Sequence, residues 1–255
     1  MSIKREELNR FFNQLLAPQE FTDYGPNGLQ IEGKEEIKKI TFSVSATRYS
    51  VEKSIELNSD ALVVHHGLFW NFHGPKIIAG PFAKRVKPLI KNDINLWGYH
   101  LPLDAHQEVG NAASLAKKLG LENLTSFGDY KGSPTGISGQ WSTPLKANDL
   151  KKTLEKVLGH SVLHACSYDN REVKSVGIIT GGANGEWKQA VKYSLDAYIT
   201  GEMSEHDWHE SSESDIHMFA GGHHATERLG TLALMDAVKN KFNIECEFID
   251  SENPA

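Results

Sequence analysis

Short apolar runs alternate with amphipathic segments along the whole chain. Residues 61–64 form an apolar run with two β-branched members that leads into His65, His66 and a glycine, which is typical of a buried strand. Apolar and polar residues alternate over 40–46, and the segment from Ser50 to about residue 57 fits a short helix. This β-α-β spacing predicts parallel strands joined by a right-handed crossover. Parallel strands bring their carboxyl ends to one edge of the sheet, where such folds hold their functional groups.

The same patterns predict further elements of both kinds. We expect a helix capped by Ser2, a helix from Pro81 as far as Pro88 or beyond, and helices at 111–119, at 147–158 and ending near 242. We expect strands at 94–99, 161–165, 173–179, 197–200, 216–220 and 244–249. Residues 23–33 are rich in turn formers and are predicted to form a loop, in which Asn27 and Gln30 either contact a polar ligand or belong to a plain surface turn.

The glycine-rich and proline-rich stretch 126–139 is expected to be the seam between two lobes. The predicted fold is therefore α/β, with two α/β lobes and mixed, largely parallel sheets. We expect the first lobe at 1–125, the second at 126–225, and a C-terminal helix and strand at 226–255.

Composition and charge limit the cellular location and the partners that are expected. The chain has 255 residues and is 39% hydrophobic, which suffices for a sizeable core, and no apolar run reaches the length of a membrane span. The first residues lack the apolar core of a secretory signal, and two distant cysteines have no C-x-x-C partner, so a cytoplasmic location is expected. A net charge of −6 disfavours a nucleic-acid-binding surface.

Three predicted strand ends carry metal-ligand side chains: His65 with His66, His100 with Asp104, and His223 with Glu227. His223 and Glu227 are four residues apart at the start of a helix and share one face. Any one of these histidines alone is more often a solvated or structural side chain, but three such ends together favour a metal site. Imidazoles and carboxylates without thiolate suit Zn²⁺, Fe²⁺, Mn²⁺, Co²⁺ or Ni²⁺, and two carboxylates allow two ions to be bridged, as in hydrolases.

Several motifs together resemble one known family. They are His65-His66-Gly-Leu-Phe-Trp70, Tyr99-His100-Leu-Pro-Leu-Asp104-Ala-His106 and Gly222-His223-His224-Ala-Thr-Glu227-Arg228, joined by the 23–30 loop and by residues 201–206. The chain resembles the GTP cyclohydrolase I type 2 homologue family, whose dinuclear-metal proteins are also known as YbgI-like or NGG-interacting-factor-three-like. The resemblance spans nearly the whole chain.

The resemblance implies a pair of metal ions in the cleft between the lobes, closed by residues 226–255. It implies that the ligands are His65, His66, Asp104, His223 and Glu227, with Glu227 as the bridge and His100 beside them. It also implies a toroidal homohexamer with its sites facing an inner cavity. The family name implies opening of a purine nucleotide ring, and members have also been connected with damaged nucleotides and with metal delivery.

Proton transfer during hydrolysis needs an acid–base group within hydrogen-bond reach. We predict this role for His100, Glu202 or His206, although Glu202 and His206 equally fit a solvated turn. Arg228 fits either a phosphate contact or an ion pair with a carboxylate. The glycine loop 181–185 fits either a phosphate cradle or a tight β-α turn, and the turn is favoured because the loop lacks a Walker lysine.

Two functions follow as hypotheses. The first is a dinuclear-metal-dependent hydrolase acting on a nucleotide or related small molecule, with two divalent ions drawn from Zn, Fe, Mn or Ni. The alternative is a non-catalytic metal-binding protein, either a metal chaperone or a scaffold. A nucleic-acid clamp is a third, weaker hypothesis, and no membrane partner is expected.

Overall fold

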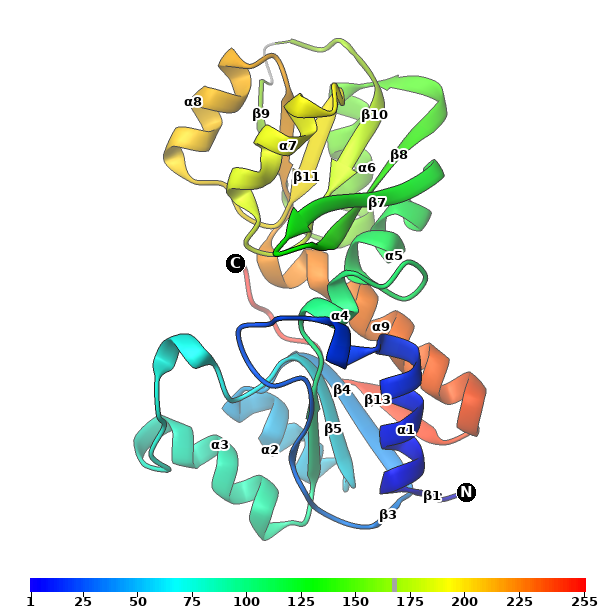
Figure 1. The fold of residues 1–255 in the computed structure, drawn as a ribbon, viewed down its shortest axis with the longest axis vertical. Helices are drawn as coiled ribbons and strands as arrows, with labels where there is room; N and C mark the ends of the chain where they lie inside the picture. The colour runs from blue at the N-terminus through cyan, green and yellow to red at the C-terminus, as the bar shows by residue number, and fades with distance from the viewer. Residues whose placement is uncertain (167–168) are drawn as a thin grey trace. The chain divides into compact units, whose positions relative to one another are not determined.

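The computed structural model describes residues 1–166 and 169–255, and the chain divides into two compact α/β units (Figure 1). Unit 1 consists of residues 1–103 and 231–251, and unit 2 consists of residues 104–230 and 252–255. The boundaries expected after 125 and after 225 therefore differ from the structure. The first boundary lies before residue 104 and not after 125, because α5 (Asn111–Lys118) contributes Ala112, Leu115 and Ala116 to the core of unit 2.

A five-stranded sheet forms the centre of unit 1, in the order β13-β4-β5-β6-β2. Its strands are β2 (Gly28–Ile31), β4 (Lys39–Ser45), β5 (Ala61–His66), β6 (Asn95–Gly98) and β13 (Glu245–Phe248). All neighbouring pairs are parallel except β2 with β6. The predicted β-α-β unit is confirmed, because β4 and β5 pair in parallel through α2 (Arg48–Glu56). A separate antiparallel pair joins β1 (Ile3–Lys4) to β3 (Glu36–Ile37).

Helices cover both faces of the unit 1 sheet (Figure 1). On one face, α2 and α3 (Gly80–Lys91) bury Val51, Val86 and Leu89 against Leu62 and Leu96. On the other face, the Phe12 ring of α1 (Arg5–Leu16) packs on Trp97 and Tyr99, and Phe11 meets Phe242 near the end of α9 (His223–Phe242). Burial on both faces explains why β5 is almost continuously apolar. In β4, whose polar residues alternate with apolar ones, the buried Thr41 hydroxyl is satisfied by Ser54 and by the carbonyl of Ala61.

A six-stranded mixed sheet forms the centre of unit 2, in the order β7-β8-β10-β11-β12-β9. Its strands are β7 (Glu122–Tyr130), β8 (Ser133–Lys146), β9 (Leu163–Ala165), β10 (Glu172–Ile178), β11 (Ala197–Thr200) and β12 (His217–Ala220). The three central strands β10, β11 and β12 are parallel, and the flanking pairs are antiparallel. The chain is thus a mixed α/β protein with largely parallel sheet centres, as predicted.

Alternating side chains of the unit 2 strands enter two separate cores. Val176, Ile178 and Phe219 face α5, α6 (Ala147–Leu158) and the start of α9. Tyr198, Met218 and other side chains from the opposite face meet α7 (Trp187–Lys192), with α8 (Glu205–Glu213) beside β12. Helices therefore flank this sheet on both sides as well (Figure 1).

Two of the predicted loops are wrong. Within 23–33, residues 28–31 form β2, which pairs with β6 at the sheet edge and leaves its central residues half-buried, so no alternation marks it. The 126–139 stretch is no seam, because most of it belongs to the β7–β8 hairpin. Its glycines serve the hairpin: Gly128 and Gly132 adopt positive φ, and a Cβ on Gly136 would overlap the carbonyl of Ile178.

One predicted helix begins at a different residue, one has an end that the sequence left open, and one helix was not predicted. Lys4, and not Ser2, precedes α1, because Ile3 and Lys4 pair with β3. The helix α3 continues past Pro88 to Lys91. The helix α8 was not predicted, since its sequence has almost no apolar face and is held by a capping box of Ser204 and Asp207.

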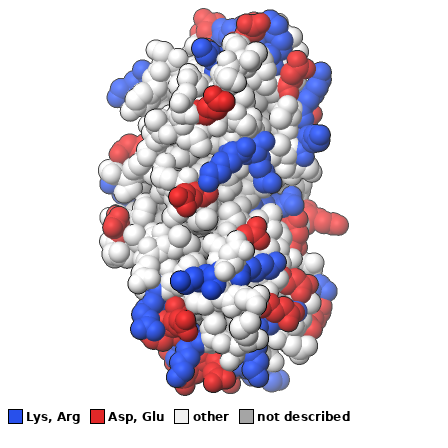
Figure 2. Space-filling model, turned by 90° about the vertical axis from the view of Figure 1, so that its right-hand side faces the viewer, with Lys and Arg blue, Asp and Glu red and all other residues white. Residues whose placement is uncertain are grey.

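The remaining short elements are α4 (Leu101–Asp104) and three 3₁₀ turns, η1 (Pro18–Glu20), η2 (Asn71–His73) and η3 (Asn184–Glu186). No helix in the ranges 1–166 and 169–255 combines the length and apolarity that crossing a membrane requires. On the face drawn in Figure 2, basic and acidic side chains are interspersed, in keeping with a modest net charge of −6.

Candidate metal centre

Unit 1 brings three histidines together at the carboxyl ends of neighbouring strands. His65 and His66 end β5, and His100 follows the adjacent parallel strand β6. One ring nitrogen from each of these three histidines lies within 4.8 Å of the others. His65 is fully buried, while His66 and His100 are partly exposed. The predicted clustering of these strand ends is therefore present within unit 1.

Hydrogen bonds hold the Nδ1 atom of every one of these rings. His65 Nδ1 lies 3.0 Å from the carbonyl oxygen of Tyr99. Because a carbonyl only accepts, Nδ1 carries the proton, and the lone pair of the neutral ring is then on Nε2. His66 Nδ1 lies 2.9 Å from Ser45 Oγ, and His100 Nδ1 lies 2.7 Å from Asp23 Oδ1. Metal-binding histidines are typically oriented by such a second hydrogen bond.

The Asp23 carboxylate fixes the position of the His100 ring. Its side chain is almost fully buried and accepts hydrogen bonds from His100 Nδ1, from Asn27 Nδ2 and from the backbone N–H of Leu101. Burial raises the pKa of Asp23, but these donors and the charge of His100 outweigh it, so the pKa lies below its ordinary value. Asp23 is therefore a buried anion that fixes the His100 ring.

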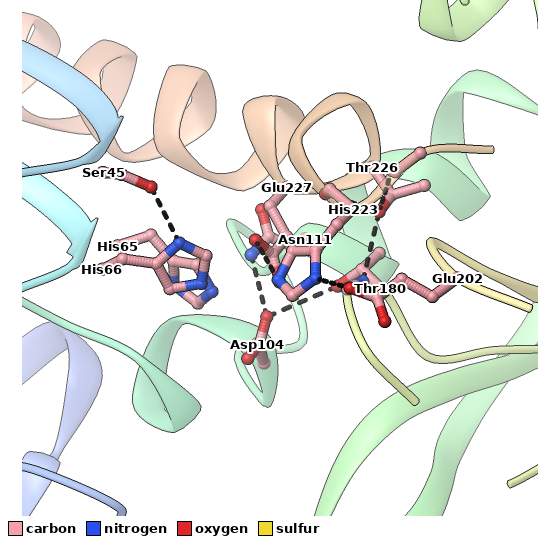
Figure 3. A network of polar contacts seen from close by, with 12 residues as sticks. Ser45, His65, His66, Asp104, Asn111, Thr180, Glu202, His223, Thr226 and Glu227 are labelled. Carbon is pink, nitrogen blue, oxygen red and sulfur yellow. Dashed lines mark hydrogen bonds and ion pairs between the residues drawn. The ribbon is translucent and has the colours of Figure 1, made fainter. Parts of the chain in front are cut away.

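Unit 2 brings two carboxylates and a histidine together. One carboxylate oxygen of Asp104 and one of Glu227 lie within 4.8 Å of each other. Asp104 Oδ1 accepts from Asn111 Nδ2 at 2.8 Å and from Thr180 Oγ1 at 3.4 Å (Figure 3). Both carboxylates are at least nine-tenths buried. Two buried carboxylates this close favour a shared positive charge, which a divalent ion bound by both would supply.

His223 lies between two glutamates. Its Nδ1 is 2.6 Å from Glu202 Oε1, and its Nε2 is 3.3 Å from Glu227 Oε2 (Figure 3). Burial lowers the pKa of His223, but the hydrogen bonds and negative charges of Glu227 and Glu202 raise it to about 9. Glu202 holds the Nδ1 proton, so Nε2 is the atom that would bind a metal ion, which takes the place of a proton there.

A glycine makes room for these ligands. Gly181 adopts φ +68°, and a Cβ at this position would overlap Glu227 Oε1 and lie 3.2 Å from His223 Nε2. The loop 181–185 connects β10 to η3 and α7, so it is the tight β-α turn that the sequence favours. The backbone thus passes against both ligand atoms, and only glycine permits this approach.

The chemistry of both groups fits a divalent transition metal. Unit 1 supplies imidazole nitrogens, and unit 2 supplies one imidazole and two carboxylates. Among the described residues, neither Cys166 nor Cys246 belongs to these groups. This donor set suits ions such as Zn²⁺, Fe²⁺, Mn²⁺ or Ni²⁺ better than Mg²⁺ or Ca²⁺.

Other predicted site residues have different surroundings. The His206 side chain on α8 is 62% exposed and lies 3.6 Å from Asp207. Arg228 Nη1 is 3.4 Å from the carbonyl of Leu158, so this guanidinium has a backbone contact. The amides of Asn27 and Gln30 line a small cavity with His65 and His100, but both are engaged within unit 1: Gln30 bonds the backbone of Pro26 and Leu68.

Four residues that orient the candidate ligands could not be recognised in this role from the sequence. They are Asp23, Ser45, Asn111 and Thr180. Asp23 and His100 are 77 positions apart, and Thr180 and Asp104 are 76 apart, so no local pattern reports either contact.

Comparison with known proteins identifies the family. The family model for Duf34/NIF3 (NGG1p interacting factor 3) matches residues 3–254. The chain belongs to the Duf34/NIF3 family. A relative from Haemophilus influenzae, named GTP cyclohydrolase 1 type 2 homolog, is 43% identical over 250 residues, which are 98% of each chain. The Escherichia coli K12 protein of the same name is 40% identical over 99% of this chain and 100% of its own.

Solved structures agree with this assignment. A structure titled protein ybgI, of unknown function, is 39% identical, covers 99% of this NIF3 chain and 100% of its own, and has a TM-score of 0.91. TTHA1606 from Thermus thermophilus is 32% identical, with the same coverage and a TM-score of 0.90. The predicted family resemblance is confirmed.

Proposed function

We propose that this NIF3 protein is a dinuclear-metal-dependent hydrolase acting on a nucleotide or a related small molecule. The observation that carries the proposal is that each ligand histidine has its Nδ1 atom held by a fixed partner, so that Nε2 is presented for a metal ion. Histidines that ligate a metal typically have such a second hydrogen bond, which fixes the ring and its tautomer.

In this proposal the two groups act as one centre. His65 and His66 from unit 1 and Asp104, His223 and Glu227 from unit 2 would hold two divalent ions, with Glu227 as the ligand that they would share. The metals are Zn, Fe, Mn or Ni. The family membership and the imidazole–carboxylate donor sets support this assignment.

Bound ions of this kind polarise the bond that is broken and supply a nucleophilic oxygen at neutral pH. The chain's own residues then have distinct tasks. His100 transfers a proton at Nε2, because Asp23 Oδ1 accepts from its Nδ1–H and fixes the orientation of the ring. Glu202 positions His223 through its Nδ1 proton. We assign no proton transfer to His206, because its exposed ring lies beside Asp207.

The first test is metal analysis of the purified protein, followed by a screen of nucleotides and phosphoesters against the apo, Zn²⁺, Mn²⁺, Fe²⁺ and Ni²⁺ forms. We expect turnover that chelation abolishes and a metal restores. Asp104→Asn and Glu227→Gln should abolish turnover and retain the circular dichroism spectrum. The matched control is Asp149→Asn, an exposed carboxylate on α6, which should behave as wild type.

A tight metal complex that turns over no substrate in any metal form would contradict the proposal and favour the metal chaperone or scaffold. In the scaffold case, metal removal would lower only the thermal stability.

We further propose that the protein assembles as a toroidal homohexamer in the cytoplasm. Family membership supports this, and so does the exposure of the large apolar side chains Ile77, Ile90 and Leu163. Light scattering after size exclusion should give a mass about six times 28.3 kDa. A monomer mass at micromolar concentration would refute the assembly and leave the metal centre unaffected.

A further inference from the structure

Three aromatic side chains of unit 1 form a continuous surface, which we call the aromatic ledge: Tyr24, Trp70 and Phe72. The rings of Trp70 and Phe72 are stacked, with centroids 5.6 Å apart and an interplanar angle of 26°. The Tyr24 ring meets Phe72 edge-on at 6.4 Å. These residues come from the segment before β2 and from the loop after β5, so the fold assembles the ledge from separate parts of unit 1.

Two of the three rings of the ledge are open to solvent, while Trp70 is half-buried. Phe72 is 67% exposed and Tyr24 is 39% exposed. Leaving flat apolar rings in water forgoes the free energy that their burial would supply, so contiguous exposed rings usually mark a binding surface.

The ledge adjoins the histidine group of the candidate metal centre. The Trp70 ring centroid lies 5.1 Å from that of His100 and 6.0 Å from that of His66. Tyr24 lies 5.9 Å from His100. A flat ring stacked on the ledge would therefore place its neighbouring atoms beside the histidines of unit 1.

A positively charged side chain lies next to the ledge. A surface hollow of about 370 Å³ is lined by Phe69, Trp70, Asn71, Gly74, Pro75 and Lys76. Lys76 Nζ donates to the carbonyl of Leu68 at 3.1 Å and lies 4.9 Å from the Phe82 ring centroid. Within the described residues, no ion pair joins Lys76 to a carboxylate. Its remaining N–H groups are suited to the oxygens of an anion.

We propose that the aromatic ledge and Lys76 bind a planar heteroaromatic ring that carries a phosphate, as a nucleotide does, with the ring stacked on the exposed Phe72 and the phosphate on Lys76. Stacking tolerates any base, because every base has a π-face. This inference specifies the substrate class of the proposed hydrolase and rests on that function for turnover, but the binding itself does not require turnover.

The test is calorimetric titration of the metal-loaded protein with adenosine 5′-monophosphate, adenosine and ribose 5-phosphate. Phe72→Ala should weaken both adenine ligands by about tenfold or more and leave ribose 5-phosphate unchanged. Lys76→Gln should weaken adenosine 5′-monophosphate and leave adenosine unchanged. The control is Trp208→Ala, which removes a 40% exposed aromatic ring on unit 2 and should change none of the affinities.

Metal content and phosphoester turnover of the same variants separate this inference from the proposed function. Adenine binding that depends on Phe72, without turnover in any metal form, would support the ledge and overturn the hydrolase. Metal-dependent turnover with adenine affinity unchanged by Phe72→Ala would overturn the ledge. An unchanged affinity with a smaller assembly mass for Phe72→Ala would also overturn it, because the ledge would then be a contact between copies of the chain. Phe72 is exposed enough for this variant to fold.

Discussion

Gly181→Ala is the sharpest single perturbation of the unit 2 ligands. At φ +68° an alanine costs about 1–2 kcal/mol relative to glycine. Its Cβ would also overlap Glu227 Oε1 and press on His223 Nε2 at 3.2 Å, so the carboxylate must leave its position. We expect this variant to lose metal as well as stability.

Gly159→Ala is the matched control for this variant. Gly159 ends α6 at φ +64°, and a Cβ there would meet nothing within 4 Å. This variant therefore has the backbone cost alone, about 1–2 kcal/mol, which corresponds to a fall in melting temperature of about 2–8 °C.

The assay is metal stoichiometry by mass spectrometry together with thermal unfolding of the apo proteins. Gly159→Ala should retain full metal content, whereas Gly181→Ala should retain less than half and unfold at a lower temperature than the control. If Gly181→Ala binds metal as wild type does, the reasoning that places Glu227 Oε1 among the ligands is refuted.

Three further predictions concern buried polar residues: Asn111, Asp23 and His164. Asn111→Ala should lower the free energy of unfolding by about 1–3 kcal/mol in chemical denaturation, because it removes a donor to the buried Asp104 Oδ1 and an acceptor of the Gly230 N–H. An unchanged midpoint would contradict this. Asp23→Asn should reduce turnover while metal content stays within a fifth of wild type, because it weakens the hold on His100 Nδ1; full activity would contradict it. Burial, and then the charge of His217, lower the pKa of His164 from 6.5 to about 4, so the unfolded state binds the proton more tightly. The free energy of unfolding should therefore keep its full value above pH 6.5 and fall by about 3 kcal/mol between pH 6.5 and pH 4. The fall should be smaller in His164→Phe, which is measured by denaturant unfolding at a series of pH values. Identical pH curves for the two proteins would refute this.

Much of the fold could be predicted because the central strands are buried on both faces. The apolar runs that end at His65 and at Ala220 mark β5 and β12, and the parallel pairing follows from the helices between strands. β2 could not be predicted, because an edge strand with half-buried residues carries no periodicity. The hairpin of β7 and β8 was not predicted, because its glycines are typical of a loop. In the structure they allow positive φ angles and a close backbone contact.

The candidate ligands could be predicted because each follows a recognisable strand end. The residues that orient them could not, because their contacts join distant segments: Ser45 meets His66 from a neighbouring strand, and Asn111 reaches Asp104 from α5. The contact of Glu202 with His223 Nδ1 also needed the structure, because the two residues are 21 positions apart and no local pattern joins them.

The most direct measurement is an anomalous difference map from crystals of the protein grown with Mn²⁺ or Zn²⁺ and recorded at the metal absorption edge. The account predicts two peaks per chain, each within bonding distance of side chains from both units, with a Glu227 oxygen on both. Peaks confined to the histidines of unit 1, or an absence of peaks in protein that binds metal in solution, would contradict it.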